Sequence, residues 1–190
     1  MAAQFDKMLV LDLDETLVHS VGFGFEEERS LRDAHFHVDD GDIGVYRRPG
    51  VEEFLDWCLE KFAAVGIWTA GTLSYAQELV PYLCDPDALE FLWGRERCGS
   101  RRDLETQETN WVKDIRKLRK LGYARSQILC VDDTPENFAR SYGNYIYMRP
   151  FEGDPEDDML PRLRRYLETL GPVPNVRAVE KRGWQLRSPA

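Results

Sequence analysis

Short apolar runs alternate along this chain with segments that have the spacing of amphipathic helices. Runs that predict buried strands occupy residues 7–13, 64–69, 127–131 and 144–148. Helices are expected over residues 51–62, 74–83 and 157–170. Strands with continuous apolar runs are buried on both faces, as in a parallel sheet that carries helices on each side. The alternation therefore predicts an α/β fold, a Rossmann-like parallel sheet flanked by helices.

Two segments interrupt this alternation without requiring a second domain. Residues 35–50, HFHVDDGDIGVYRRPG, contain two alternating runs around DDGD and predict a small β-hairpin. Residues 84–112 are irregular, and we expect a short insertion there, followed by a helix that begins at Lys113. With 190 residues, we expect a single domain over residues 1–175, without a large cap. Residues 176–190 form a C-terminal tail in this prediction, with Trp184 as a candidate anchor.

The bulk composition argues against several classes of partner. Lysine and arginine total 25 against 34 aspartate and glutamate residues, a formal net charge of −9. Direct nucleic-acid binding is not expected, because it requires a basic face. No apolar stretch approaches the ~20 residues that span a bilayer, and the start lacks the apolar segment of a signal peptide. We therefore expect a soluble, intracellular protein, cytoplasmic or nuclear, without a membrane partner.

The four cysteines do not suggest a zinc site, because none of them forms a C-x-x-C pair. Cys58 and Cys130 lie within apolar patterns and are expected to be buried thiols. Cys84 and Cys98 are close enough in the sequence to pair in principle. A reducing compartment is the simpler expectation for a chain of this kind.

Polar side chains follow several of the predicted strands. Asp12 and Asp14 come at the end of the first strand, in VLDLDETLVHS, and Thr69 ends the second. A further acidic pair, 132–133, ends the third strand, and Lys113 precedes that strand. Because ligands bind at the carboxyl ends of parallel strands, we expect these groups to converge at one edge of the sheet.

Clustered carboxylates with a threonine and a lysine suggest the chemistry of phosphoryl transfer. Unpaired carboxylates repel one another, so a cation must lie among them, and hard oxygen ligands with open positions suit Mg²⁺. Thr69 and Lys113 offer a hydroxyl and an ammonium to a phosphoryl group. One aspartate can attack phosphorus and the other can transfer the protons that the reaction needs.

Five motifs in order resemble one family. They are LVLDLDETLVHS, YRRPGVEEFL, IWTAGTLSYA, NWVKDIRKL and ILCVDDTPENF, and the resemblance covers roughly residues 7–170. D-x-D-x-T with a later threonine, lysine and acidic pair is similar to the haloacid dehalogenase superfamily of aspartate-dependent phosphatases. The fuller strings resemble the branch with the RNA polymerase II C-terminal-domain phosphatases and the nuclear-LIM-interactor-like phosphatases. The resemblance implies the haloacid dehalogenase fold.

The resemblance also implies roles for individual residues. Asp12 would be the nucleophile and Asp14 the general acid and base. The phosphoryl group would be held by Thr69, Ala70 and Lys113. Mg²⁺ would be bound by the Asp12 carboxylate, the Asp14 main-chain carbonyl and Asp133, with Asp132 behind it or as a further ligand. Thr16 is expected to steady the loop after the nucleophile.

The substrate implied by the resemblance is a phosphorylated protein or peptide, carrying phosphoserine or phosphothreonine. The chain departs from the family in reading DDTP and TAG where many relatives read Asp-Asn-Ser-Pro and TAS. Residues 84–112 match the family poorly, and in relatives this segment helps to choose the phosphopeptide. The aromatic residues Phe91, Trp93 and Trp111 in it are either core or a substrate groove.

Three other functions stay open. A small-molecule phosphatase could use the same chemistry, although a site without a large cap favours a polypeptide substrate. A phosphoacceptor receiver domain needs its acceptor aspartate at a middle strand end before the threonine, and the order of acids here argues against it. A catalytically inactive, phosphatase-like adaptor would have lost a catalytic group, whereas Asp12 and Asp14 are both present. His19 is expected to pack or form hydrogen bonds near the site rather than act as a base.

Overall fold

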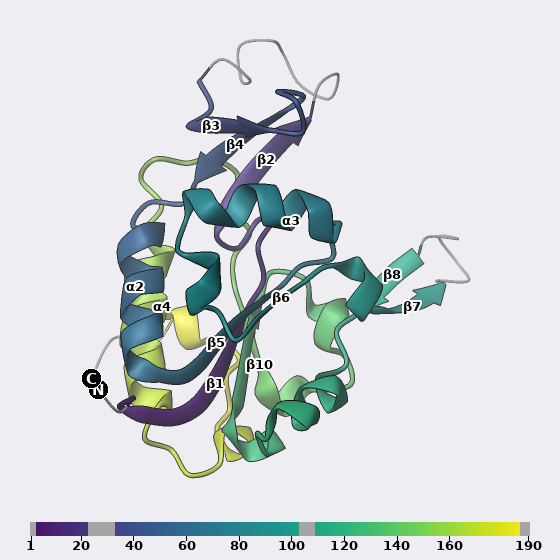
Figure 1. Ribbon diagram of the computed structural model, residues 1–190. Coiled ribbons are helices and arrows are strands. Elements are labelled where there is room, and N and C mark those ends of the chain that lie inside the picture. The colour runs from purple at the N-terminus through teal and green to yellow at the C-terminus, as the bar shows by residue number, and fades with distance from the viewer. Residues whose placement is uncertain (1–2, 23–32, 103–108, 187–190) are drawn as a thin grey trace.

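A parallel sheet of five strands forms the centre of the protein (Figure 1). The computed structural model describes residues 3–22, 33–102 and 109–186. The strands run in the order β10-β9-β1-β5-β6. Their bounds are Phe5–Leu11 for β1, Phe62–Trp68 for β5, Phe91–Trp93 for β6, Ile128–Asp132 for β9 and Tyr145–Tyr147 for β10. The α/β fold expected from the sequence is confirmed.

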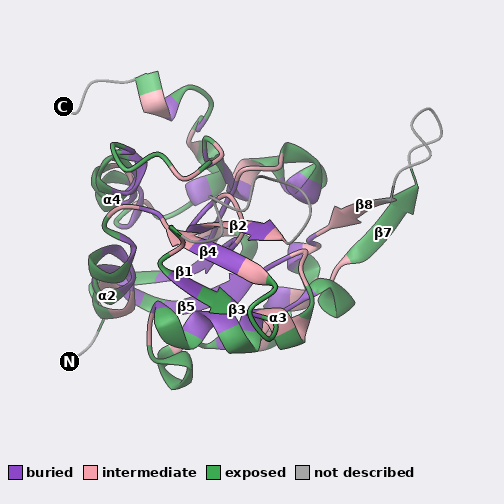
Figure 2. Cartoon of the chain, turned by 90° about the horizontal axis from the view of Figure 1, so that it is seen from above, coloured by how far each residue is buried: buried purple, intermediate pink, exposed green. Residues whose placement is uncertain are grey.

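Successive residues of the central strands face opposite layers of the protein, as the period of a strand requires. Leu9 and Leu11 of β1 join the larger apolar cluster, which includes residues of helices α2 (Val51–Lys61) and α4 (Met159–Leu170). Met8 and Val10 point the other way and join a second cluster, which short 3-10 segments at 115–121 and 135–138 help to cover. Figure 2 shows the buried strands enclosed by helices with exposed outer faces.

The first strand lies two residues earlier than predicted. β1 ends at Leu11, which pairs with Ile67 of β5 and Val131 of β9. The Asp12 amide still donates to the Val131 carbonyl at 2.9 Å, and beyond it the chain leaves the sheet. The apolar run continues because Leu13 is also fully buried, although it lies outside the strand. A prediction from the apolar pattern alone therefore ends the strand too late.

The predicted hairpin forms, but it belongs to a three-stranded sheet. β3 (Phe36–Val38) and β4 (Ile43–Arg47) pair antiparallel, and β2 (Val18–Gly22) pairs with the other edge of β4. The turn between β3 and β4 places Asp39 and Asp40 at φ values of 56° and 55°. β2 was not expected, because VHSVG is short and follows directly on the aspartate motif.

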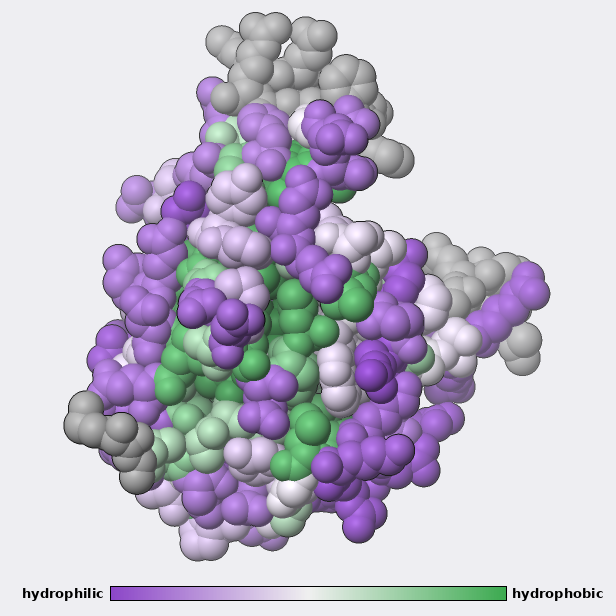
Figure 3. Space-filling view, in the orientation of Figure 1, coloured by the Kyte–Doolittle hydropathy of each residue, from purple (hydrophilic) through white to green (hydrophobic). Residues whose placement is uncertain are grey.

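The helices fall close to their predicted positions. α2 ends at Lys61, and β5 begins at the next residue, whose amide bonds to the Cys58 carbonyl. α3 spans Leu73–Leu79 and continues as a 3-10 turn with Pro81 in it, as expected. α4 is amphipathic and buries a row of leucines against the sheet. In Figure 3, apolar surface gathers between α2 and α3, and hydrophilic surface surrounds it.

Residues 84–112 are only partly an insertion. Phe91–Trp93, β6, forms the edge strand of the central sheet beside β5, and Phe91 is buried in the second cluster. The remainder includes β7 (Gly99–Arg102) and β8 (Thr109–Val112), an antiparallel pair that projects from the body (Figures 1 and 2). Trp111 lies in β8, where its ring stacks under Arg95. Lys113 directly follows β8, so it does not begin the helix as predicted, and the 3-10 segment starts at Ile115.

The described residues after α4, up to residue 186, pack against the body of the protein. Trp184 is 4% exposed, its ring stacks on Tyr166, and its Nε1 donates to the Tyr147 carbonyl at 2.7 Å. Lys181 is buried and donates to three backbone carbonyls, among them that of Gly143. Trp184 is therefore the anchor that the sequence suggested.

The structure also shows the state of the cysteines and the length of the helices. Cys58 and Cys130 are buried, as predicted, and all four cysteines, including Cys84 and Cys98, are free thiols. Within the described residues, the helices are all too short or too polar to span a bilayer.

Candidate active site

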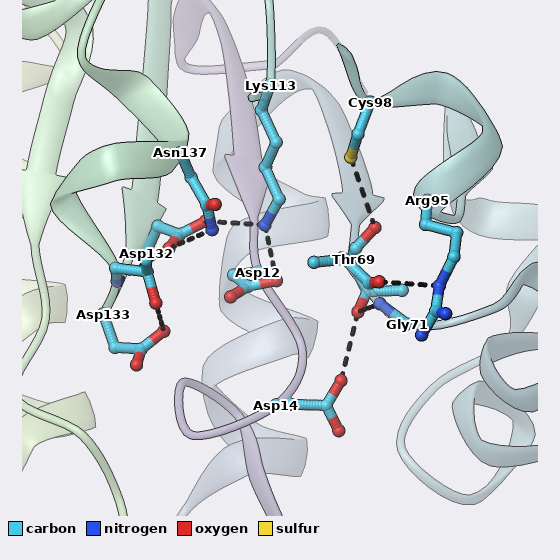
Figure 4. A network of polar contacts seen from close by, with 12 residues as sticks. Asp12, Asp14, Thr69, Gly71, Arg95, Cys98, Lys113, Asp132, Asp133 and Asn137 are labelled. Atoms are coloured by element: carbon cyan, nitrogen blue, oxygen red, sulfur yellow. Dashed lines mark hydrogen bonds and ion pairs between the residues drawn. The ribbon is translucent and has the colours of Figure 1, made fainter. Parts of the chain in front are cut away.

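The carboxyl ends of three neighbouring strands bring the predicted residues together (Figure 4). Asp12 follows β1, Thr69 follows β5, and Asp132 is the last residue of β9. Lys113 lies on the segment after β8, and its side chain points toward Asp12. Parallel strands end at a common edge, so residues that are far apart in the sequence share one site.

Lys113 lies between two carboxylates. Its Nζ is 2.6 Å from Asp12 Oδ1 and 2.6 Å from Asp132 Oδ2, and all three side chains are buried. Burial by itself lowers the pKa of a lysine, but the charges of Asp12 and Asp132 outweigh it and raise the pKa of Lys113. The ammonium therefore remains protonated and supplies fixed positive charge next to Asp12.

Asp132 has both carboxylate oxygens already occupied. Oδ1 accepts from the Thr134 amide at 2.8 Å and from Asn137 Nδ2 at 3.0 Å, while Oδ2 accepts from Lys113. Asp132 is therefore better placed to orient Lys113 than to bind a metal through one of its oxygens. Asn137 was missed by the sequence analysis. Its place in DDTPEN, five residues after Asp132 on a 3-10 turn, is a weak signal without the structure.

The acidic group of Asp12, Asp132 and Asp133 fits a divalent cation held by Asp12 and Asp133, with Asp132 adjoining them. One oxygen from each lies within 4.8 Å of the others, and oxygen ligands of this kind suit Mg²⁺. Burial, followed by the charge of Asp132, raises the pKa of Asp12. Lys113 is the one ammonium that contacts this group among the described residues, so the three carboxylates are short of positive charge. The donor set and its charge both favour a cation beside Asp12 and Asp133.

The Asp14 carboxylate faces away from that group. Its Oδ2 accepts from the Thr69 hydroxyl at 3.1 Å, and its Oδ1 accepts from the Tyr75 hydroxyl at 2.6 Å. Tyr75 in turn lies 2.6 Å from Ser20 Oγ on β2. Burial and the charge of Asp14 raise the pKa of Tyr75, so its hydroxyl stays a proton donor. The two aspartates of the D-x-D motif therefore have separate surroundings, one among acids and one among hydroxyls.

The comparisons with known proteins decide the family. The family model described as NLI interacting factor-like phosphatase matches residues 7–177. This chain belongs to that family. The match includes every predicted site residue, and the haloacid dehalogenase fold expected from the motifs is confirmed.

Curated proteins about one third identical to this chain support the family. The probable C-terminal domain small phosphatase of Dictyostelium discoideum is 31% identical, over 91% of this chain and 53% of that protein. The human carboxy-terminal domain RNA polymerase II polypeptide A small phosphatase 1 is 30% identical, over 94% of this chain and 65% of that protein. The chain thus spans about half the length of the first curated relatives that it matches.

A solved structure shares the fold. The RNA polymerase II CTD phosphatase Fcp1 of fission yeast, in a variant bound to beryllium fluoride, matches 87% of this chain and 50% of that chain. The TM-score is 0.56 and the sequence identity is 22%, so the likeness concerns the fold.

Arg48 steadies the loop that follows the second aspartate of the D-x-D motif. The loop turns at Glu15, whose φ is 54°, in the left-handed region. Arg48 is fully buried and donates to the Thr16 carbonyl at 3.0 Å, and it binds Asp157 through two nitrogens at 2.7 and 2.9 Å. The Thr16 hydroxyl is buried without a hydrogen-bond partner among the described residues. The steadying role expected of Thr16 therefore falls largely to Arg48, which the sequence analysis did not single out.

Ala70, expected to help hold a phosphoryl group, and His19, expected to pack near the site, both lie close to it. Ala70 follows Thr69, and its carbonyl accepts from Arg95 Nε at 3.0 Å. His19 lies against Tyr46, with ring centroids 6.1 Å apart, and its Nδ1 is 3.4 Å from a Glu15 oxygen. These contacts agree with a packing role for His19.

Removing the hydroxyl of Tyr75 tests whether it positions Asp14. Tyr75→Phe loses one of two hydrogen bonds to this carboxylate, and bonds to charged groups are worth about 1.5–3 kcal/mol. We expect kcat to fall about 10- to 100-fold, with KM little changed, in steady-state assays on an aryl phosphate. Tyr142→Phe, which removes the hydroxyl bonded to exposed Glu180, is the matched control and should match the wild type. A rise in KM at constant kcat would instead show that Tyr75 binds substrate.

Proposed function

We propose that this chain is an Mg²⁺-dependent phosphomonoesterase that removes phosphate from phosphoserine or phosphothreonine in proteins, through a phosphoryl group carried on Asp12. The observation that carries this proposal is the buried Asp12 carboxylate, held by Lys113 and adjoining an acidic group short of positive charge. Asp14, the second aspartate of the motif, lies nearby and accepts hydrogen bonds from the Thr69 and Tyr75 hydroxyls.

In the first half of the proposed reaction, an Asp12 oxygen attacks phosphorus and the ester P–O bond breaks. Asp14 gives its proton to the leaving oxygen of the serine or threonine. Lys113 contacts Asp12 Oδ1, which holds the carboxylate in place and offsets charge as two anions approach. In the second half, Asp14 takes a proton from water, the water oxygen attacks phosphorus, and the bond to Asp12 breaks, which releases phosphate and restores both acids.

Thr69, the neighbouring Ala70 and Lys113 surround the position that the phosphoryl group would take. The Thr69 hydroxyl oxygen also accepts a hydrogen bond from the Gly71 amide at 2.8 Å, which fixes the orientation of the hydroxyl. Asp12, Asp133 and the Asp14 main-chain carbonyl would hold Mg²⁺, which would supply further positive charge to the phosphoryl group.

A protein substrate is supported by the relatives. The human relative is named a phosphatase of the carboxy-terminal domain of an RNA polymerase II polypeptide. In this proposal the chain works inside the cell, in the cytoplasm or the nucleus. The test compares turnover of phosphoserine peptides with turnover of a panel of phosphorylated metabolites. We expect the peptides to be hydrolysed with the higher kcat/KM, and a hundredfold preference for one metabolite would overturn the protein substrate.

Removal of the metal gives a separate test with a readout besides activity. A chelator should abolish hydrolysis, and added Mg²⁺ should restore it. Mg²⁺ alone should also raise the melting temperature, because a ligand that binds only the folded state stabilises it by RT ln(1 + [L]/Kd). Asp133→Asn should lose most of this shift, whereas Asp56→Asn on the exposed face of α2 should keep it. An Mg²⁺ shift of equal size in Asp133→Asn would argue against a metal at this position.

A further inference from the structure

A cavity of about 370 Å³ opens directly beside Asp14. Its walls come from the three-stranded sheet, through Ser20 and Ile43, and from α3, through Tyr75 and Glu78. Because Tyr75 links Asp14 to Ser20, the cavity begins where the proposed proton transfer takes place. A residue next to the phosphorylated one in a bound peptide would therefore reach it.

Most of the side chains that line the cavity are polar, and two of them besides Asp14 are acids. Hydroxyl groups line it at Ser20, Thr72 and Ser74, and Ile43 supplies apolar surface. The acids are Asp39, in the turn between β3 and β4, and Glu78, on α3.

Asp39 and Glu78 are held next to each other by the backbone. The Asp39 amide donates to both Glu78 oxygens, at 3.1 and 3.0 Å. This contact joins the turn to α3 and brings the two acidic residues together. Within residues 3–22, 33–102 and 109–186, neither acid forms an ion pair with a lysine or arginine. Two adjacent carboxylates of this kind attract a cation.

The cavity also contains one positive charge, which forms no ion pair with these acids among the described residues. Arg95 also lines it, and its Nε is bound to the Ala70 carbonyl, next to Thr69. One side of the cavity thus favours the phosphate anion and the other a cation. A peptide with a basic residue beside its phosphorylated residue has the same separation of charge.

We infer that this cavity is a subsite for a lysine or arginine side chain that flanks the phosphorylated residue, an inference that rests on the proposed function. The ammonium or guanidinium meets Asp39 and Glu78, and its apolar stem lies along Ile43. A glutamate or a second phosphate at the same position meets these two acids and is repelled. The chain therefore acts on phosphorylation sites in basic segments and discriminates against acidic or multiply phosphorylated ones.

Three phosphoserine peptides that differ only in the flanking residues, lysine, alanine or glutamate, test this inference. Exposed ion pairs contribute about 0.2–1 kcal/mol each, so two acids should favour lysine over glutamate about 10-fold in kcat/KM. The three peptides are made twice, once with the varied residue before the phosphoserine and once with it after, because either side of the peptide can enter the cavity. The preference should shrink as salt is added, since the acids are exposed.

Charge variants assign the preference to the cavity. Asp39→Asn with Glu78→Gln keeps the shape and an acceptor for the Asp39 amide, and should bring the lysine-to-glutamate ratio close to 1. Asp39→Asn with Glu78→Lys, which leaves a single positive charge there, should reverse it. The matched control, Glu53→Gln with Asp56→Asn, removes two exposed acids of α2 that do not line the cavity, and should keep the ratio.

The outcomes separate this inference from the proposed function. Equal hydrolysis of the three peptides, or a ratio unchanged in the folded Asp39→Asn/Glu78→Gln variant, would overturn the subsite and leave the phosphatase proposal standing. Hydrolysis of an aryl phosphate without hydrolysis of any phosphopeptide would remove the protein substrate, and the subsite with it. Melting temperatures of the variants verify that each is folded.

Discussion

Asp12→Asn will lose phosphatase activity by about 10⁴-fold or more, the scale seen when a catalytic nucleophile is removed. The amide keeps the size of the carboxylate and can still contact Lys113, but it cannot form a bond to phosphorus. Hydrolysis of an aryl phosphate measures the loss without any contribution from peptide binding. The fold should survive, because Asp12 is an acid short of positive charge and Lys113 retains its contact with Asp132.

The control for this loss is Asp56→Asn, an exposed acid of α2 that should leave turnover unchanged. A melting temperature of Asp12→Asn equal to or above that of the wild type separates lost chemistry from lost structure. More than a tenth of wild-type turnover in purified Asp12→Asn would show that the nucleophile is another group.

Arg48→Met will lower the free energy of unfolding by about 3–5 kcal/mol, the usual result when one partner of a buried ion pair is removed. Burial alone would raise the pKa of Asp157, but hydrogen bonds from Arg48 outweigh it and keep that pKa below its usual value. Without Arg48 this carboxylate is left buried, with exposed Arg149 as its remaining charged partner. The Thr16 carbonyl also loses its donor, so activity should fall as well. Urea denaturation measures the change.

The neighbouring Arg47 provides a matched control, because its ion pair with Glu52 is partly exposed. Arg47→Met should cost less than about 1 kcal/mol. Arg48→Met combined with Asp157→Leu should be more stable than Arg48→Met alone, since no unpaired charge is then buried. If Arg48→Met differed from the wild type by no more than Arg47→Met does, the buried pair would not brace the loop.

Local patterns in the sequence predicted the sheet and the position of the site, because buried strands and their polar ends are adjacent in the chain. Asp12, Thr69 and Lys113 were placed together on that ground, and the structure brings them together. Contacts that depend on distant segments were not predictable in this way. Arg48 meets Asp157 across 109 positions, and Tyr75 meets Ser20 across 55.

The difference between local patterns and distant contacts also explains where the predicted fold was wrong. β6 lies within a segment that looks irregular, because three residues give too short a pattern, and it becomes a strand only by pairing with β5. Lys113 seemed to begin a helix, whereas pairing of the preceding residues with β7 makes them a strand. In both cases tertiary pairing outweighs the local preference of the sequence.

The most direct test of the central claim is to trap the phosphorylated protein. The chain is mixed with ³²P-labelled phosphoserine peptide and Mg²⁺, stopped with acid within one turnover, digested and analysed by mass spectrometry. We predict an acid-stable, hydroxylamine-sensitive label on the peptide that contains Asp12, and no label in Asp12→Asn. Label on another residue, or turnover with no labelled protein at any time, would contradict the account.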